Sequence, residues 1–66
     1  MEVVANGERL NLKESTNVET LIEELNIKDR VMGVAINSKI VKKEEWSTTE
    51  LQQDDKIEFL SFVGGG

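Results

Sequence analysis

The chain has 66 residues, 38% of them hydrophobic, and a formal net charge of −5. This suits one small domain and argues against nucleic acid as a partner, because phosphate binding needs clustered Lys and Arg. Cysteine and histidine are absent, which removes disulfides, thiol nucleophiles, the usual zinc ligands and the usual general base. An enzyme is therefore disfavoured, and no catalytic or metal-binding residue is predicted.

No apolar run approaches the ~20 residues of a membrane span. Residues after Met1 lack the basic region and apolar stretch of a signal peptide. We therefore expect a cytoplasmic protein that does not engage a membrane.

The chain opens with a predicted β-hairpin. Residues 1–5 and 8–12 flank Asn6-Gly7, and Asn-Gly is the strongest short hairpin signal because a type I′ turn needs positive φ at both central residues. A two-residue loop pairs Ala5 with Glu8. Alternation then places one apolar set on a single face, namely Met1, Val3, Leu10 and Leu12.

A short amphipathic helix follows. Thr16 and Glu19 fit a capping box at its start, and Asn26 is a plausible stop. Apolar residues recur at i, i+3, i+4 and i+7 and predict one stripe that packs on a sheet. These residues are Val18, Leu21, Ile22 and Leu25. The acidic residues between them are interpreted as a solvated face, with a binding surface as the alternative.

Residues 31–36 are almost continuously apolar and predict a strand buried on much of both faces. Asn37-Ser38 can turn the chain into a short return strand over residues 39–41. The only tryptophan, Trp46, is expected to fold back from a helical turn or loop onto the core, and ligand stacking is the alternative. Leu51 is predicted to be an anchor before the turn at residues 52–55.

The last strand is predicted over residues 56–63. Alternation assigns the core face to Ile57, Phe59, Ser61 and Val63. Leu60 and Phe62 then point away from the helix, toward solvent or a partner, unless a loop covers them. Exposed apolar side chains that gather at one spot mark an interaction surface. We therefore predict that Leu60, Phe62 and the adjacent Val63 dock a partner.

Three glycines, Gly64, Gly65 and Gly66, follow this strand directly. Composition alone suggests a disordered tail. The alternative is a flexible arm, because glycine has no Cβ to clash in a narrow channel. Residues 1–63 would then be the folded domain and residues 64–66 the tail, with the terminal carboxylate of Gly66 as the one distinctive reactive group.

Hairpin, helix, strand pair, loop and final strand is the element order of a ubiquitin-like β-grasp domain. Residues 35–46 read A-I-N-S-K-I-V-K-K-E-E-W and resemble the A-I-N-x-x-I-V-x-x-x-x-W stretch of the ThiS family of sulfur carriers. Residues 54–57 resemble its D-G-D-x-I turn, with Asp55 where Gly is common. Lys42 and Gly64 also depart from the frequent Pro and Ala of the family.

The resemblance implies an α+β, ubiquitin-like β-grasp fold with a mixed sheet of four to five strands and one main helix on one face. It also implies a carrier that is not an enzyme. A ThiF-type adenylating enzyme would use ATP and magnesium to activate Gly66, and a sulfur donor protein would supply the sulfur of a thiocarboxylate. A ThiG-type thiazole synthase would consume that sulfur in thiamine biosynthesis. The carrier itself would bind no cofactor and be a monomer when free.

Two alternatives to this function stay open. One is a sulfur carrier of another pathway, like the small subunit of molybdopterin synthase or a carrier in amino-acid sulfur transfer. The other is a ubiquitin-like protein modifier that conjugates to lysine through Gly66.

Overall fold

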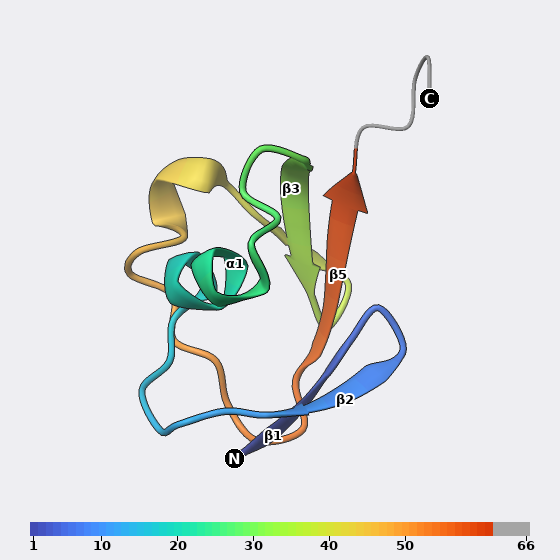
Figure 1. Ribbon diagram of the computed structural model, residues 1–66, viewed down its shortest axis with the longest axis vertical. Helices are drawn as coiled ribbons and strands as arrows, with labels where there is room; N and C mark the ends of the chain where they lie inside the picture. The colour runs from blue at the N-terminus through green and yellow to red at the C-terminus, as the bar shows by residue number, and fades with distance from the viewer. Residues whose placement is uncertain (62–66) are drawn as a thin grey trace.

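Five strands, one α-helix and a short 3₁₀ turn follow one another along residues 1–61, the part of the chain that the structure, a computed structural model, describes. Their bounds are β1 (Glu2–Ala5), β2 (Glu8–Asn11), α1 (Val18–Leu25), β3 (Val31–Ile36), β4 (Lys39–Val41), η1 (Lys43–Glu45) and β5 (Lys56–Ser61). The strands form one sheet in the order β2-β1-β5-β3-β4. In this sheet β1 and β5 run parallel, whereas the other neighbours are antiparallel. Helix α1 lies across one face of the sheet (Figure 1), which confirms the predicted α+β arrangement.

The first hairpin has the predicted turn and register. Asn6 and Gly7 adopt φ values of 49° and 84°, as a type I′ turn requires. The strand pairs are Val3–Leu10 and Ala5–Glu8, together with Glu2–Asn11 and Val4–Arg9. The pairing extends one step further, since the amide of Leu12 donates to the carbonyl of Met1 at 2.7 Å.

Helix α1 begins one residue later than the predicted capping box. Its N-cap is Asn17, whose side chain accepts a hydrogen bond from the Thr20 amide at 2.7 Å. The hydroxyl of Thr16 instead donates to the carbonyl of Lys13 at 2.7 Å. The capping-box prediction for Thr16 and Glu19 was therefore wrong. The predicted stop is confirmed, because Asn26 is left-handed with φ 58° and ends the helix.

The reason for this shift lies in a distant segment. The carbonyl of Thr16 accepts from the Leu51 amide at 2.8 Å, and the Val18 amide donates to the Thr49 carbonyl at 3.0 Å. Asn17 forms an isolated bridge with Glu50 between these two bonds. The backbone before the helix is thus held extended by residues that are about thirty positions away, so the helix starts only after Asn17.

The core lies between α1 and the inner face of the sheet. It comprises Val3, Ala5, Val18, Leu21, Ile22, Val34, Trp46, Leu51, Ile57 and Phe59. Trp46 is 3% exposed, and its Nε1–H donates to the carbonyl of Val41 at 3.1 Å. The indole is thus buried with its one polar group satisfied, which confirms packing rather than ligand stacking. Among residues 1–61, no helix is long and apolar enough to cross a lipid bilayer.

The turn that leads into β5 differs from the expected one in detail. The left-handed residue is Asp54, with φ 69°, and Asp55 is not in that conformation. A glycine is favoured at a positive φ, so the glycine position of the turn falls on Asp54 rather than on Asp55. Asp tolerates this conformation better than most side chains, which explains how the turn forms without a glycine.

Candidate functional site

Strand β5 lies at the centre of the sheet and carries the predicted site at its end. Ile57 and Phe59 are buried, at 1% and 9% exposure, whereas the side chain of Leu60 is 47% exposed. Leu60 therefore points away from the core, as the alternation of the strand predicted. This confirms the predicted direction of Leu60, and no loop of the described chain hides it.

The first residues of β5 are held in place by the turn between β3 and β4. Asn37 Nδ2 donates to Asp55 Oδ1 at 2.9 Å, while Asn37 Oδ1 accepts from the Lys56 amide at 3.0 Å. The Asn37 amide also donates to the Lys56 carbonyl at 2.7 Å. One side chain thus joins the turn to the beginning of β5.

Leu60 lies on a glycine of the neighbouring strand. Gly33 pairs with Leu60 across β3 and β5, and a Cβ added to Gly33 would lie 3.4 Å from Leu60 Cδ1. This is a van der Waals contact with the mobile end of a side chain. Leu60 thus lies directly over the backbone of β3 at Gly33, a contact that the sequence analysis did not predict.

Three further exposed apolar side chains were missed. Ile40 is 65% exposed and Met32 is 67% exposed. Leu25 was predicted in the packed stripe of α1, but at the last residue of the helix it is 36% exposed. Ile40 pairs with Ala35, which pairs in turn with Glu58, so Ile40 lies on the same face of the sheet as Leu60. Met32 sits where the register between β3 and β5 shifts, between Val31 and Gly33. The turn at residues 37–38 fixes the register of β4, so alternation could have found Ile40, whereas a bulge leaves no clear signal in the sequence.

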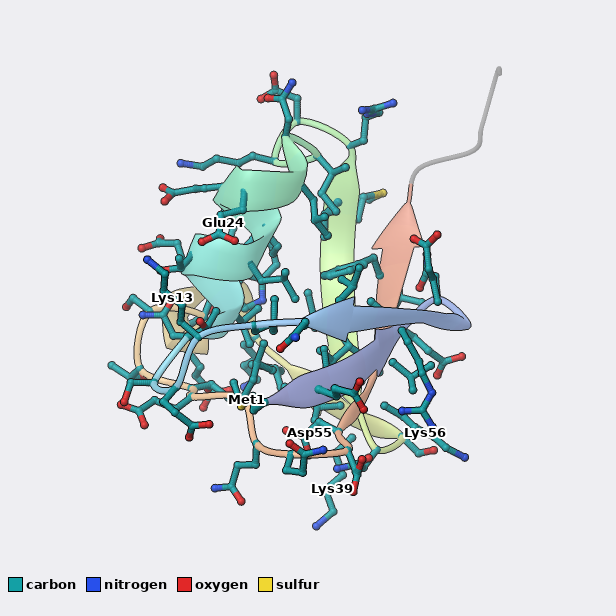
Figure 2. The ribbon with its side chains drawn as sticks, turned by 60° about the horizontal axis from the view of Figure 1, so that its bottom comes forward. Met1, Lys13, Glu24, Lys39, Asp55 and Lys56 are labelled. Carbon is teal, nitrogen blue, oxygen red and sulfur yellow. The ribbon has the colours of Figure 1, made fainter. Side chains whose placement is uncertain are left out.

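We call the face of the sheet opposite α1, carrying Gly33, Ala35, Ile40 and Leu60, the outer face. Charged residues flank it on β5, where Lys56 and Glu58 share the outward direction with Leu60. Figure 2 shows Lys56, Asp55 and Lys39 at one end of the molecule, far from the end of β5, and Glu24 on the helix side. Leu60 and Ile40 on the outer face thus lie on a different surface from the acidic residues of α1.

The remaining predicted site residues lie outside the described residues. These are Phe62, Val63, Gly64, Gly65 and Gly66. Their roles in docking and in carrying the reactive carboxylate therefore stay predictions. Within residues 1–61, no group of three or more acidic side chains is arranged to hold a metal ion.

A mixed five-stranded sheet with parallel β1 and β5 at its centre, and one helix packed across one face, defines a ubiquitin-like β-grasp domain. The sequence model of the ThiS family matches residues 1–66. The chain therefore belongs to the ThiS family.

Known relatives agree with this assignment. The crystal structure of the thiamine biosynthesis protein ThiS from Geobacter metallireducens matches with a TM-score of 0.83 and 31% identity, covering 100% of both chains. The sulfur carrier protein ThiS of Bacillus subtilis is 32% identical over 62 residues, which are 92% of this chain and 94% of that protein. A thiazole synthase of Paramagnetospirillum magneticum is 38% identical over 66 residues, all of this chain but only 20% of that protein. The chain thus spans about a fifth of the length of this thiazole synthase.

Proposed function

We propose that this chain is a sulfur carrier in thiamine biosynthesis and that its reactive group is the carboxylate of Gly66. The observation that carries the proposal is membership of the ThiS family over residues 1–66. The architecture is consistent with this role, since β5 ends beside the exposed Leu60 and the sequence then runs into three glycines. The chain itself performs no catalysis in this scheme.

The proposed chemistry has two steps. A carboxylate is a poor acyl donor, so the Gly66 carboxylate first attacks the α-phosphate of ATP in the active site of a ThiF-type adenylating enzyme. An acyl adenylate forms and pyrophosphate leaves. Magnesium bound by that enzyme would neutralise the charge of the phosphates. Sulfur at the oxidation level of hydrosulfide, supplied by a donor protein, then attacks the acyl carbon. The carbon–oxygen bond to AMP breaks, AMP leaves, and a thiocarboxylate with one released proton remains.

The glycines suit the tail to both steps. Glycine has no Cβ and adopts extended conformations freely, so it fits narrow sites in which a larger residue would clash. Three residues reach at most about 10 Å when extended. The folded domain must therefore dock close to the active site of each partner, and Leu60 with the outer face offers the apolar contact for it.

We further propose that the sulfur acceptor is a thiazole synthase of the ThiG type. The similarity to the thiazole synthase of Paramagnetospirillum magneticum and to a second thiazole synthase from Magnetococcus marinus favours this acceptor over those of other pathways. The choice between acceptors is tested by supplying the thiocarboxylate form of the chain to a thiazole synthase and measuring thiazole formation. Loss of the sulfur without thiazole formation would point to another pathway.

Intact-protein mass spectrometry tests the carrier function itself. After incubation with ATP, magnesium, a sulfur donor and the adenylating enzyme, we expect a gain of about 16 Da as sulfur replaces oxygen. Deletion of Gly66 should abolish the gain, and the circular dichroism spectrum should be unchanged, because the five strands and α1 end at Ser61. An unchanged mass, in a reaction that converts a control carrier, would refute the proposal. Adducts with lysines of other proteins that resist reducing agents would instead support a protein modifier.

A further inference from the structure

Strand β5 is paired unequally along its two sides. On the β3 side its partners run from Ile57, which pairs with Ile36, to Ser61, which pairs with Val31. On the β1 side only Lys56 and Ile57 have strand partners. In Figure 1, β1 accordingly lies beside the lower part of β5 and leaves its upper part with a neighbour on one side only.

Asn6 ends the pairing on the β1 side. Its amide donates to the Ile57 carbonyl at 2.9 Å. This bond follows the one from the Val4 amide to the Asp55 carbonyl in the same ladder. Its Oδ1 then accepts from the Phe59 amide at 2.9 Å. Since Asn6 has a φ of 49°, its backbone turns away from β5 at this point. The side chain therefore replaces the next carbonyl that a longer β1 would have supplied.

Beyond this bond, the β1 side of β5 is open. Within residues 1–61, no hydrogen bond reaches the carbonyl oxygen of Phe59. The amide of Ser61 faces the same side, because backbone groups of residues i and i+2 point alike along a strand. Within the described part of the chain, this carbonyl and this amide, two residues apart, have no strand partner on the β1 side. Such a pattern can pair with an added strand.

The two outer edges of the sheet differ from this open edge. Strand β2 exposes Glu8 and Arg9, and β4 has only three residues and begins with Lys39. Charge and shortness are the usual means by which proteins prevent pairing at an edge. The open edge of β5 carries no charge over its described residues, since Phe59, Leu60 and Ser61 are uncharged. It is also bordered by the exposed side chain of Leu60.

We propose that the β1 side of β5, from the Phe59 carbonyl to the Ser61 amide, binds an extended strand of the adenylating enzyme, and that Asn6 sets where this docking edge begins. The choice of partner rests on the proposed carrier function. Glycines offer no side chain to recognise, so an enzyme that acts on Gly66 must hold the tail by its backbone. A strand paired at the docking edge would continue toward those glycines and align them.

Hydrogen exchange followed by NMR tests the docking edge with the unmodified chain. On addition of the adenylating enzyme with ATP and magnesium, exchange of the Ser61 amide should slow by about tenfold or more. The Arg9 amide is the matched control, because a two-residue hairpin turns the backbone groups of Arg9 toward the outer edge of β2. Equal exchange of Ser61 with and without bound enzyme overturns the proposal. Concentration-dependent protection in the free chain also overturns it and identifies a second copy as the occupant.

A backbone substitution gives a second, independent measurement. A chain of 66 residues is within reach of chemical synthesis, so an N-methyl group can replace the amide hydrogen of Ser61, or of Arg9 as the control. We expect enzyme affinity, measured by calorimetry, to fall about tenfold or more for Ser61, as one good hydrogen bond in a strand contact is lost and a methyl group is added. The Arg9 form should bind with the affinity of the unmodified chain.

Two outcomes separate the two proposals. If the unmodified chain supports no ATP–pyrophosphate exchange, the proposed carrier function is refuted. If exchange occurs and N-methylation of Ser61 leaves the affinity unchanged, only the proposed docking edge is refuted.

The role of Asn6 is tested separately. Asn6→Gly keeps the positive φ and removes the acceptor, so exchange of the Phe59 amide in the free chain should rise about tenfold. Asn6→Asp keeps an acceptor at the same position and should leave that exchange unchanged. The same rate in both variants and the parent chain would overturn the assignment of Asn6.

Discussion

The beginning and the end of β5 are held very differently. At its beginning, the strand is bonded to β1 through the Asp55 and Ile57 carbonyls, and to the turn beyond β3 through the side chain of Asn37. At its end, Leu60 and Ser61 are paired with β3 alone. The same six-residue strand is thus a buried centre of the sheet at one end and an open edge at the other.

This difference shows how a small domain can be stable and still keep part of a strand accessible to a binding partner. The buried half of β5 contributes Ile57 and Phe59 to the core, which stabilises the fold. The other half exposes Leu60 over Gly33 and a free backbone edge. The end keeps its pairing with β3 on one side, and this holds its direction within the sheet. A partner can therefore use the end without competing with the core.

The largest expected effect comes from the buried half. Ile57 is 1% exposed, so Ile57→Ala should lower the free energy of unfolding by about 2–5 kcal/mol through lost burial and a cavity. Small domains have little stability in reserve, so much of the protein should be unfolded at 25 °C. Urea denaturation followed by circular dichroism measures this. A loss below that of Leu60→Ala would contradict the contrast between the two halves.

A smaller effect is expected at the anchor. Asn37→Gly keeps the left-handed φ of 51° but removes the bonds to Asp55 and to the Lys56 amide. We expect a loss of about 1–2 kcal/mol in the free energy of unfolding. Ser38→Gly is the matched control, because Ser38 has a φ of 72° and is the other central residue of the turn. Equal stability of the two variants would show that the side chain of Asn37 anchors nothing.

The smallest effect on stability is expected at the exposed end. Leu60→Ala should lower the free energy of unfolding by at most about 1 kcal/mol, because 47% of Leu60 is already exposed. Affinity for the adenylating enzyme should nevertheless fall about fivefold or more. Ile40→Ala, at 65% exposure on the same face, tests how far the docking surface extends. If the Leu60→Ala variant binds the adenylating enzyme with unchanged affinity, Leu60 does not contact that enzyme.

Much of this molecule followed from local sequence. Asn6-Gly7 predicted a tight turn with positive φ and Asn37-Ser38 predicted a turn into the next strand, and a two-residue turn fixes the register of the strands it joins. The outward direction of Leu60 followed in the same way, because side chains alternate along a strand. The resemblance carried by residues 35–46 then pointed to the family that the whole-chain comparison shows.

Other features were decided only by the tertiary structure. The helix is capped by Asn17 rather than Thr16 because residues 49–51 bond to the backbone just before it. The pairing of Gly33 with Leu60 and the bulge at Met32 depend on how β3 meets β5. The sequence alone determined the turns, the amphipathic helix and the alternation of β5, since these depend on residues close together in the chain. Which side of β5 stays open was decided by the parallel pairing with β1, which joins residues more than fifty positions apart and leaves no local pattern.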